Sequence, residues 1–369
     1  MSQSLHRKNI LAIKPYVPGK PVEEVERELG ITNVIKLASN ENPLGPSPKA
    51  VAAIRQLAPT VSLYPDGNCY YLKEALAGRF QIGADQLFIG NGSDEIIEII
   101  AKAFLEEGEE AVMADTTFSE YDFAVKVMSG VSVTVPLKNL THDLAAMADA
   151  VTEKTKLFFI CNPNNPTGTI VDKKAVAELM QRLPERVIVV FDEAYHEYVT
   201  DPAYPQTLDY VRAGRNVVIL RTFSKIYGLA GLRVGYAIST PEIVGMLNRV
   251  KEPFNVNLLA QAAALAALDD TEHLERSLQV NEEGKAYLYK EFDRMGLAYE
   301  TTHGNFIWVQ VRADSQKVFQ KLLHLGVIVR TGDIFGAPDV LRVTIGTPEQ
   351  NRRFIAALHT VLTEEGVLK

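Results

Sequence analysis

The sequence has few of the features that mark secreted, membrane-bound or nucleic-acid-binding proteins. Only two cysteines, Cys69 and Cys161, occur among 369 residues, so no disulfide framework and no Cys-x-x-Cys metal pattern exists. No apolar run approaches the roughly 20 residues that a membrane-spanning helix needs. The net charge of −8 lacks the basic excess of a nucleic-acid-binding surface. These absences predict a cytoplasmic protein that handles small molecules, with no metal, nucleic acid or membrane partner.

The length of the chain predicts two domains, because 369 residues exceed what one hydrophobic core usually supports. From Leu87 onwards, strand-like runs that read as buried on both faces alternate with helix-like segments. This alternation predicts an α/β domain with a mostly parallel, seven-stranded-type sheet covered by helices. After Gly296 the pattern becomes that of a small α+β domain. The expected division is an N-terminal arm (1–35) that joins the small domain, a large domain (36–285) and a small C-terminal domain (286–369).

The most informative stretch, residues 221–236, directly follows an apolar strand-like run and contains Lys225. Lysine is rarely fully buried unless it is paired or chemically used. One such use is a Schiff base to a carbonyl cofactor. Ser224 and Arg233, in the same stretch, would suit a phosphate group. We therefore hypothesise that Lys225 carries pyridoxal phosphate, and the alternative is a surface lysine in a glycine-rich loop.

Two further clusters follow predicted strands, at the edge where open α/β sheets bind ligands. Gly92, Ser93 and Asp94 open a helix whose free N–H groups would favour a phosphate, although a plain N-cap has the same pattern. The loop from Cys161 to Gly168 contains two prolines and a glycine, which predicts a fixed, non-helical segment. Such a loop would hold an asparagine amide rigidly over a pocket.

Asp192 follows five apolar residues, so its carboxylate is expected to be desolvated. A buried carboxylate is costly without a cationic partner, and a protonated pyridine nitrogen would supply one. The alternative is a metal-binding or Walker B-type carboxylate, but the sequence contains no GxxxxGK[ST] element. Gly90-Asn91-Gly92 is only a fragment of a dinucleotide-binding fingerprint, which weakens a dehydrogenase interpretation.

This ordered set of motifs resembles the fold-type I pyridoxal-phosphate aminotransferases over nearly the whole chain. Within that superfamily, the segments Ser39–Pro46 and Pro15–Gly19 are most similar to histidinol-phosphate aminotransferases. The resemblance implies a transamination in histidine biosynthesis. That reaction interconverts histidinol phosphate plus 2-oxoglutarate with imidazole acetol phosphate plus glutamate.

The resemblance also implies roles around the cofactor. Lys225 would form the Schiff base and then move a proton, while Asp192 would pair with the pyridinium nitrogen. Tyr195 and Asn165 would hydrogen-bond the cofactor's phenolic oxygen. Phe118 would stack on the ring, with ordinary packing at a helix start as the alternative. The implied phosphate ligands are Gly92, Ser93, Asp94, Ser224 and Arg233.

For the substrate, the resemblance implies that Arg342 clamps a carboxylate, a task that suits a planar guanidinium. Tyr16, Asn40 and Arg330 would be further substrate contacts, although Arg330 could equally be a solvated charge at a strand end. Tyr64 would reach the cofactor phosphate of a neighbouring subunit, which implies a homodimer with shared active sites.

Three alternative functions stay open. An aromatic-amino-acid aminotransferase acting on phenylalanine and tyrosine would use the same machinery, and the two activities can coexist in one enzyme. A phosphothreonine decarboxylase would use the same lysine and lose carbon dioxide. The alternative from a different class is a non-enzymatic, ligand-sensing domain of the same fold. Regulators of that type carry an additional, usually basic, DNA-binding segment, whereas this chain is acidic.

Overall fold

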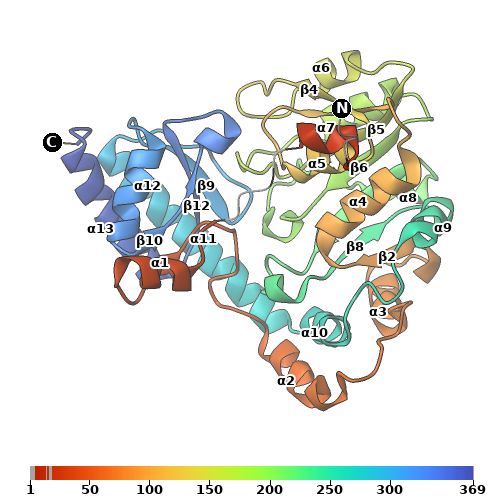
Figure 1. Cartoon of the computed structure of the whole chain (residues 1–369), viewed down its shortest axis with the longest axis horizontal. Helices are drawn as coiled ribbons and strands as arrows, with labels where there is room; N and C mark the ends of the chain where they lie inside the picture. The colour runs from red at the N-terminus through yellow and green to blue at the C-terminus, as the bar shows by residue number, and fades with distance from the viewer. Residues whose placement is uncertain (1–4, 14, 16–18, 369) are drawn as a thin grey trace. The chain divides into compact units, whose positions relative to one another are not determined.

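The computed structural model describes residues 5–13, 15 and 19–368 (Figure 1). Contacts divide the chain into two compact units. The larger unit comprises 46–165, 170–270 and the described part of 1–16; the smaller comprises 166–169 and the described parts of 17–45 and 271–369. The expected division placed 36–45 and 271–285 in the large domain, whereas their contacts group them with the smaller unit. The physical reasons are a strand pairing at Ile35–Lys36 and a continuous helix that begins at Thr271.

The larger unit is built on a seven-stranded sheet with the order β2-β8-β7-β6-β5-β3-β4. Only β8 runs antiparallel to its neighbours, so the predicted mostly parallel α/β sheet is confirmed. Its strands are β2 (Leu87–Gly90), β3 (Glu110–Ala114), β4 (Val131–Val135), β5 (Thr155–Cys161), β6 (Ile188–Asp192), β7 (Val217–Thr222) and β8 (Gly235–Ile238).

Helices cover the sheet, and three of them share one apolar core with it. These are α4 (Gly92–Phe104), α5 (Glu120–Val127) and α9 (Pro241–Val250). The other α-helices of this unit are α2 (Pro48–Leu57), α3 (Tyr70–Phe80), α6 (Leu144–Asp149), α7 (Lys173–Arg182), α8 (Leu208–Arg212) and α10 (Leu258–Leu268). Its 3₁₀ turns are η1 (Lys8–Ala12), η2 (Ala58–Thr60), η3 (Ala84–Gln86), η4 (His196–Tyr198) and η5 (Ala230–Leu232).

The apolar spacing from Leu258 to about Met295 predicts one long, mostly helical stretch, but the structure has two helices there. Helix α10 ends at Leu268, and α11 (Thr271–Met295) begins after the pair Asp269-Asp270. The carboxylate of Asp270 accepts a hydrogen bond from Ser47 Oγ at 2.5 Å, so this residue is engaged where the helix is interrupted. Helix α10 therefore belongs to the larger unit and α11 to the smaller one.

The smaller unit contains a three-stranded antiparallel sheet with the order β11-β12-β9 and a parallel pair, β1-β10. Its strands are β1 (Ile35–Lys36), β9 (Phe306–Gln310), β10 (Val327–Ile328), β11 (Arg330–Thr331) and β12 (Val340–Thr344). Its helices are α1 (Val22–Leu29), α11, α12 (Ser315–His324), α13 (Pro348–Glu364) and the 3₁₀ turn η6 (Asp333–Phe335). The sequence of Val327–Arg330 predicts a single strand, whereas the structure has two short strands, β10 and β11, in different sheets.

The N-terminal arm is divided between the units. Helix α1 packs in the smaller unit through the buried Val25. In the larger unit, by contrast, Asn9 donates hydrogen bonds to the carbonyls of Lys126 (2.7 Å) and Val127 (3.0 Å). None of the helices in the described ranges combines the length and apolar character needed to cross a bilayer.

Candidate active site

Three adjacent parallel strands bring the polar clusters predicted from the sequence to one edge of the large sheet. Strands β5 and β6 end together, with Cys161 paired to Asp192. Asp192 is in turn aligned with Leu220 of β7, two residues before that strand ends. The segments that follow these strands carry Asn165, Tyr195 and Lys225. Adjacent strand ends therefore place the three predicted segments along one edge of the larger unit.

Asp192 has a buried carboxylate with two protein donors. Its side chain lies on the face of β6 that carries Ile188 and Val190, because strand side chains alternate. On that face Oδ2 accepts a hydrogen bond from the Tyr121 hydroxyl at 2.7 Å, and Oδ1 accepts one from the Ala194 N–H at 3.1 Å. Burial raises the pKa of Asp192 to about 6, against the opposing effect of both hydrogen bonds.

Lys225 lies in the loop after β7, half-buried beside an aromatic ring. Its Nζ is 5.6 Å from the centre of the Tyr195 ring. The positive charge of Lys225 favours the ionised form of Asp192 and so lowers the pKa of that carboxyl. Backbone bonds shape the loop, since the Phe223 N–H donates to Val234 and the Gly228 N–H donates to Lys225 itself. An amine, a phenol and a carboxyl therefore share this edge of the sheet.

The opposite face of the same strand ends carries a buried ion pair. Arg221 donates from Nε (3.0 Å) and Nη2 (2.7 Å) to Oε2 of Glu193, whose side chain is 1 % exposed. The Thr207 hydroxyl donates to the other carboxylate oxygen. The Arg221–Glu193 pair joins the end of β6 to β7, directly beside Asp192 in sequence. Breaking such a pair leaves an uncompensated buried charge, so it holds the two strand ends in register.

The loop after β5 is held by side-chain hydrogen bonds, which agrees with the expectation of a fixed segment. The amide of Asn162 both donates to (3.2 Å) and accepts from (3.1 Å) the backbone of Val171. Asn164 accepts from Thr117 Oγ1 at 2.9 Å and bonds His142 Nε2 at 3.0 Å. Because the Asn164 oxygen only accepts, that His142 nitrogen carries the proton. These contacts fix the backbone that leads into the buried Asn165.

The beginning of α4 forms a cradle with the cation Arg233. The side chain of the N-cap residue Asn91 makes no hydrogen bond to the first-turn N–H groups of α4. Arg233 Nη2 is 2.9 Å from Oδ2 of Asp94. A Cβ at Gly92 would lie 2.5 Å from the same Arg233 nitrogen, and one at Gly235 would lie 2.8 Å from the Ser93 nitrogen. Only glycine permits this close approach.

The donors of this cradle suit a phosphate monoester. The cradle combines helix N–H groups with a guanidinium, and both favour an anion. The Ser224 hydroxyl stays a predicted phosphate ligand. Asp94 differs, because its carboxylate accepts hydrogen bonds only and already pairs with Arg233. Its contribution to anion binding would come from its backbone N–H. Together with the buried carboxylate of Asp192 and the amine of Lys225, this donor set fits pyridoxal phosphate.

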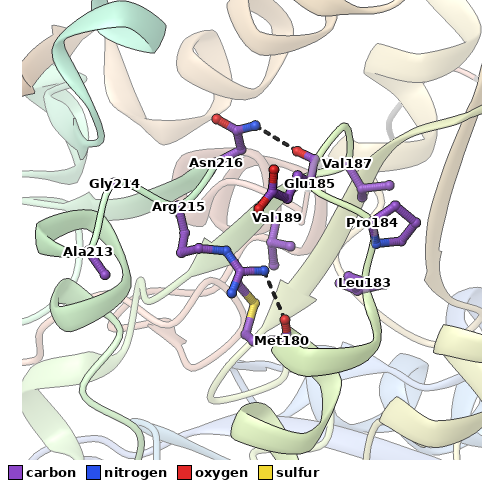
Figure 2. Close-up of a pocket in the computed structure, with 10 residues that line it drawn as sticks. All are labelled: Met180, Leu183, Pro184, Glu185, Val187, Val189, Ala213, Gly214, Arg215 and Asn216. Carbon is purple, nitrogen blue, oxygen red and sulfur yellow. Dashed lines mark hydrogen bonds between the residues drawn. The ribbon is translucent and has the colours of Figure 1, made fainter.

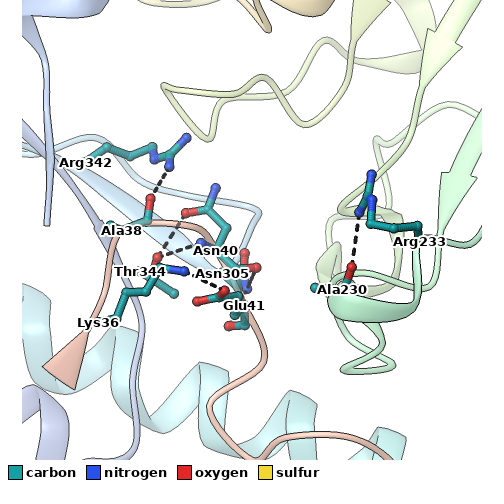
Figure 3. Close-up of polar contacts among 9 residues, drawn as sticks. All are labelled: Lys36, Ala38, Asn40, Glu41, Ala230, Arg233, Asn305, Arg342 and Thr344. Carbon is teal, nitrogen blue, oxygen red and sulfur yellow. Dashed lines mark hydrogen bonds and ion pairs between the residues drawn. The ribbon is translucent and has the colours of Figure 1, made fainter. Parts of the chain in front are cut away.

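The predicted substrate residues that the structure describes, Asn40, Arg330 and Arg342, belong to the smaller unit. Figure 3 shows Asn40 and Arg342 with their hydrogen-bond partners. Arg342, on β12, is 7 % exposed and donates from Nη2 to the Ala38 carbonyl at 2.5 Å. Its guanidinium lies over the rings of Phe306 (5.5 Å) and Phe335 (6.0 Å). Asn40 is held by Thr344, whose Oγ1 accepts from its N–H at 2.9 Å and donates to its Oδ1 at 3.0 Å.

Three further residues were predicted to belong to the site, and the structure describes two of them, Tyr64 and Phe118. Tyr64 is 83 % exposed and stacks on Phe254, with ring centres 4.7 Å apart. Tyr16 lies outside the described residues. Phe118 is half-buried and meets the edge of Tyr121 at 5.7 Å. The roles of these residues stay predictions.

Sequence reasoning missed Tyr121 and the Arg221–Glu193 pair. Tyr121 follows Phe118 by three residues. On a helix, this spacing places both side chains on one side. That spacing was the available signal. No sequence pattern indicated the ion pair of Glu193 and Arg221. Glu193 is simply the polar residue after Asp192, and Arg221 is one of several polar residues in the stretch before Lys225.

A cavity of about 190 Å³ lies at the opposite edge, where β6 and β7 begin (Figure 2). Arg215 donates to the Met180 carbonyl at 2.8 Å, and the Asn216 amide donates to the Glu185 carbonyl at 2.7 Å. Asp192 and Lys225 lie at or after the C-terminal ends of these two strands. This cavity is therefore separate from the candidate active site.

Comparison with known proteins agrees with this architecture. Residues 32–358 match the family described as aminotransferase class I and II. The chain is 60% identical over 357 residues to a histidinol-phosphate aminotransferase of Moorella thermoacetica, covering 96% of this chain and 92% of the relative. It is 49% identical to the corresponding protein of Caldicellulosiruptor saccharolyticus, over 97% and 100% of the two chains. This protein belongs to the class I and II aminotransferase family.

A solved structure extends the similarity to three dimensions. The histidinol-phosphate aminotransferase from Sinorhizobium meliloti, crystallised in complex with pyridoxal-5'-phosphate, superposes with a TM-score of 0.91. The two sequences are 28% identical, and the alignment covers 99% of each chain. The large sheet and the smaller α+β unit are thus the architecture of a known aminotransferase.

Proposed function

We propose that this protein is a pyridoxal-phosphate-dependent aminotransferase that interconverts histidinol phosphate plus 2-oxoglutarate with imidazole acetol phosphate plus glutamate. The observation that carries the proposal is the buried Asp192 carboxylate on the strand next to the one that leads to Lys225. The relatives that share 49–60% of this sequence bear the name of this activity. The reaction would serve histidine biosynthesis.

The larger unit supplies the cofactor site. When bound, pyridoxal phosphate supplies an electrophilic carbonyl carbon and an electron-withdrawing ring. Lys225 Nζ would hold the cofactor covalently and then carry the proton that leaves the substrate α-carbon. Asp192 would face the pyridinium nitrogen and keep it protonated. Asn165 and Tyr195 would donate to the phenolic oxygen, and Phe118 would cover the ring.

The phosphate of the cofactor would rest in the cradle at the start of α4. Arg233 and the Ser224 hydroxyl would bind it together with the N–H groups of Gly92, Ser93 and Asp94. Arg233 has a positive φ of 56°, which is uncommon for a residue other than glycine. This strained conformation supports a functional role for its guanidinium.

The substrate anions would be bound by two arginines of the smaller unit. Arg330 and Arg342 are directly paired across β11 and β12, so their side chains share one face of the sheet. Like charges in such a pair repel each other, and a bound phosphate or carboxylate would offset this repulsion. Both substrates are anions of this kind, which explains how one site would accept histidinol phosphate and glutamate. Asn40 and Tyr16 would provide further contacts.

Substrate preference tests this assignment. We expect kcat/KM for histidinol phosphate to exceed that for phenylalanine or tyrosine by at least about 100-fold, because a phosphate carries more negative charge toward the two arginines than the single carboxylate of an aromatic amino acid does. Steady-state kinetics with 2-oxoglutarate as amino acceptor measure this ratio. A preference for the aromatic amino acids would assign the protein as an aromatic-amino-acid aminotransferase instead. Release of carbon dioxide from phosphothreonine would indicate a decarboxylase.

We also infer a homodimer in which Tyr64 reaches the cofactor phosphate of the neighbouring subunit. Support comes from apolar side chains exposed near Tyr64 in sequence, because such a patch marks an interaction surface. These side chains are Val61 (60 %), Leu63 (68 %), Tyr70 (58 %) and Tyr71 (74 %). A second copy of the chain would cover them through a two-fold interface.

Mixing two impaired variants tests the shared site. Refolded together, Tyr64→Phe and Lys225→Ala subunits should form heterodimers with one native site that combines Lys225 from one subunit and Tyr64 from the other. Random pairing makes about a quarter of all sites native. Activity at limiting cofactor should therefore rise above the mean of the two parents. Activity equal to that mean would contradict a shared site, and light scattering independently reports the dimer mass.

A cytoplasmic location is part of the same proposal. Both cysteines, Cys69 and Cys161, are free and buried. Burial raises the pKa of Cys69 to about 11 and that of Cys161 to about 12, so both stay neutral thiols. Unpaired thiols of this type suit a reducing compartment, where biosynthesis of amino acids would take place.

A further inference from the structure

The hydroxyl of Tyr121 makes a hydrogen bond that joins α5 to the end of β6. Tyr121 is 0 % exposed, and its Oη donates to Oδ2 of Asp192 at 2.7 Å across 71 residues of sequence. Burial raises the pKa of the phenol well above its ordinary value of 10, so the hydroxyl keeps its proton. It therefore acts as a permanent donor to this carboxylate.

The ring of Tyr121 has little freedom to move. It stacks on Phe159 of β5, with ring centres 4.7 Å apart and planes inclined by 10°. Its other neighbour is Phe118, which meets it edge-to-face at 5.7 Å and 83°. Phe118 is the residue predicted to cover the cofactor ring. Tyr121 thus connects two groups that would contact the cofactor, one through packing and one through a hydrogen bond.

We propose that Tyr121 is a positioning residue, which fixes the rotamer of Asp192 and favours its ionised form for a cationic ring nitrogen. This inference rests on the proposed function. Each carboxylate oxygen of Asp192 accepts one hydrogen bond, Oδ2 from the Tyr121 hydroxyl and Oδ1 from the Ala194 N–H. An ionised carboxylate has about four acceptor positions, so acceptor capacity remains for the cofactor.

Other groups near Asp192 shift its pKa in opposite directions. Lys225 lowers the pKa of Asp192, whereas the negative charge of Asp94 raises it. Cys161, on the neighbouring strand, has a pKa raised to about 12 by burial and stays a neutral thiol. After burial itself, the Tyr121 hydrogen bond is the largest influence on the Asp192 carboxyl, and it favours ionisation.

Tyr121→Phe removes this donor and keeps the ring. In the cofactor-free protein labelled with ¹³C-aspartate, NMR titration should show the pKa of Asp192 rising from about 6 by about one pH unit. The dissociation constant of pyridoxal phosphate, measured at pH 7 by fluorescence quenching, should increase by about tenfold. In an Asp192→Asn background the same change should leave this constant nearly unaffected, since Tyr121 acts through Asp192.

A matched control is Tyr289→Phe, which deletes a hydroxyl that accepts from the Thr302 N–H at 2.7 Å in the smaller unit. It should lower stability without changing the pKa of Asp192. If Tyr121→Phe fails to fold, 3-fluorotyrosine at position 121 keeps the ring and donates a stronger hydrogen bond. The pKa of Asp192 should then fall.

Two outcomes separate this inference from the proposed function. If Tyr121→Phe leaves the pKa of Asp192 and cofactor affinity unchanged while lowering stability, Tyr121 has only a packing role and the inference is wrong. If the wild-type protein binds no pyridoxal phosphate, the proposed function fails, whatever Tyr121→Phe does to the Asp192 titration.

Discussion

Replacing Lys225 with alanine is expected to lower transaminase turnover by more than about 10⁴-fold, while pyridoxal phosphate still binds. Lys225 has two proposed roles: it binds the cofactor covalently, and it transfers the proton at the substrate α-carbon. General acid–base catalysis by a positioned side chain alone contributes about 10²–10⁴-fold. Arg233 and the start of α4 remain in the variant, so the phosphate cradle is preserved.

Single-turnover kinetics and mass spectrometry check this expectation. After borohydride reduction, the wild-type peptide that contains Lys225 should carry the mass of the reduced cofactor, and the variant should not. The control is Lys126→Ala, which removes a half-buried lysine that pairs with Asp122 at 2.6 Å on α5. It should keep full activity and labelling. Cofactor attached to another lysine in the wild-type protein would contradict the assignment of Lys225.

Replacing Asp192 with asparagine is expected to lower turnover by about 10³-fold, because a preorganised charge opposite the ring nitrogen is lost. The amide keeps the size of the carboxylate, and its oxygen still accepts from Tyr121, so the fold should persist. Steady-state kinetics measure the loss. Asp209→Asn, which removes an exposed carboxylate paired with Arg212 at 3.2 Å, is the control. Retention of most of the wild-type turnover would show that Asp192 does not support the cofactor ring.

The same substitution has a separate effect on the stability of the cofactor-free protein. The pKa of Asp192 is about 6 in the folded state, above its ordinary value of 3.8. The folded state therefore binds this proton more tightly than the unfolded state, and stability contributed by the neutral acid is lost as the pH rises from about 4 to 6. By linkage this loss is on the order of 3 kcal/mol.

Asp192→Asn cannot ionise and should not show that loss. The unfolding free energy of the variant relative to wild type should consequently increase between pH 4 and pH 7 in the absence of cofactor. Urea denaturation at a series of pH values measures the difference. A difference that is constant with pH would show that Asp192 has an ordinary pKa in the folded protein.

The sequence alone was sufficient for most helices and strands of the larger unit. Caps and apolar periodicity, which are local signals, predict helices over 48–57, 70–80 and 173–182, and the structure has helices with these bounds. The large sheet was predictable for a similar reason. Continuous apolar runs such as Val217–Leu220 indicate strands that are buried on both faces.

Other features of the fold depended on long-range packing. The apolar composition of Leu258–Leu268 continues into the helical pattern of the next segment, so its periodicity did not reveal the interruption at Asp269-Asp270. The two-residue strands β10 and β11 are too short for a pattern to separate them. Residues 36–45 group with the smaller unit through a pairing of β1 with β10 that no local signal announces.

Within the candidate site, the sequence by itself determined which residues follow buried strands: Asn165, Asp192 and Lys225. A polar residue at or shortly after the end of an apolar run is a local pattern, and parallel strands then bring such residues to one edge. Only the tertiary structure decided their partners. Tyr121 meets Asp192, Arg221 meets Glu193, and Arg330 lies opposite Arg342 because of helix packing and strand register. Each of these pairs joins different elements, and sequence periodicity carries no information about contacts at that range.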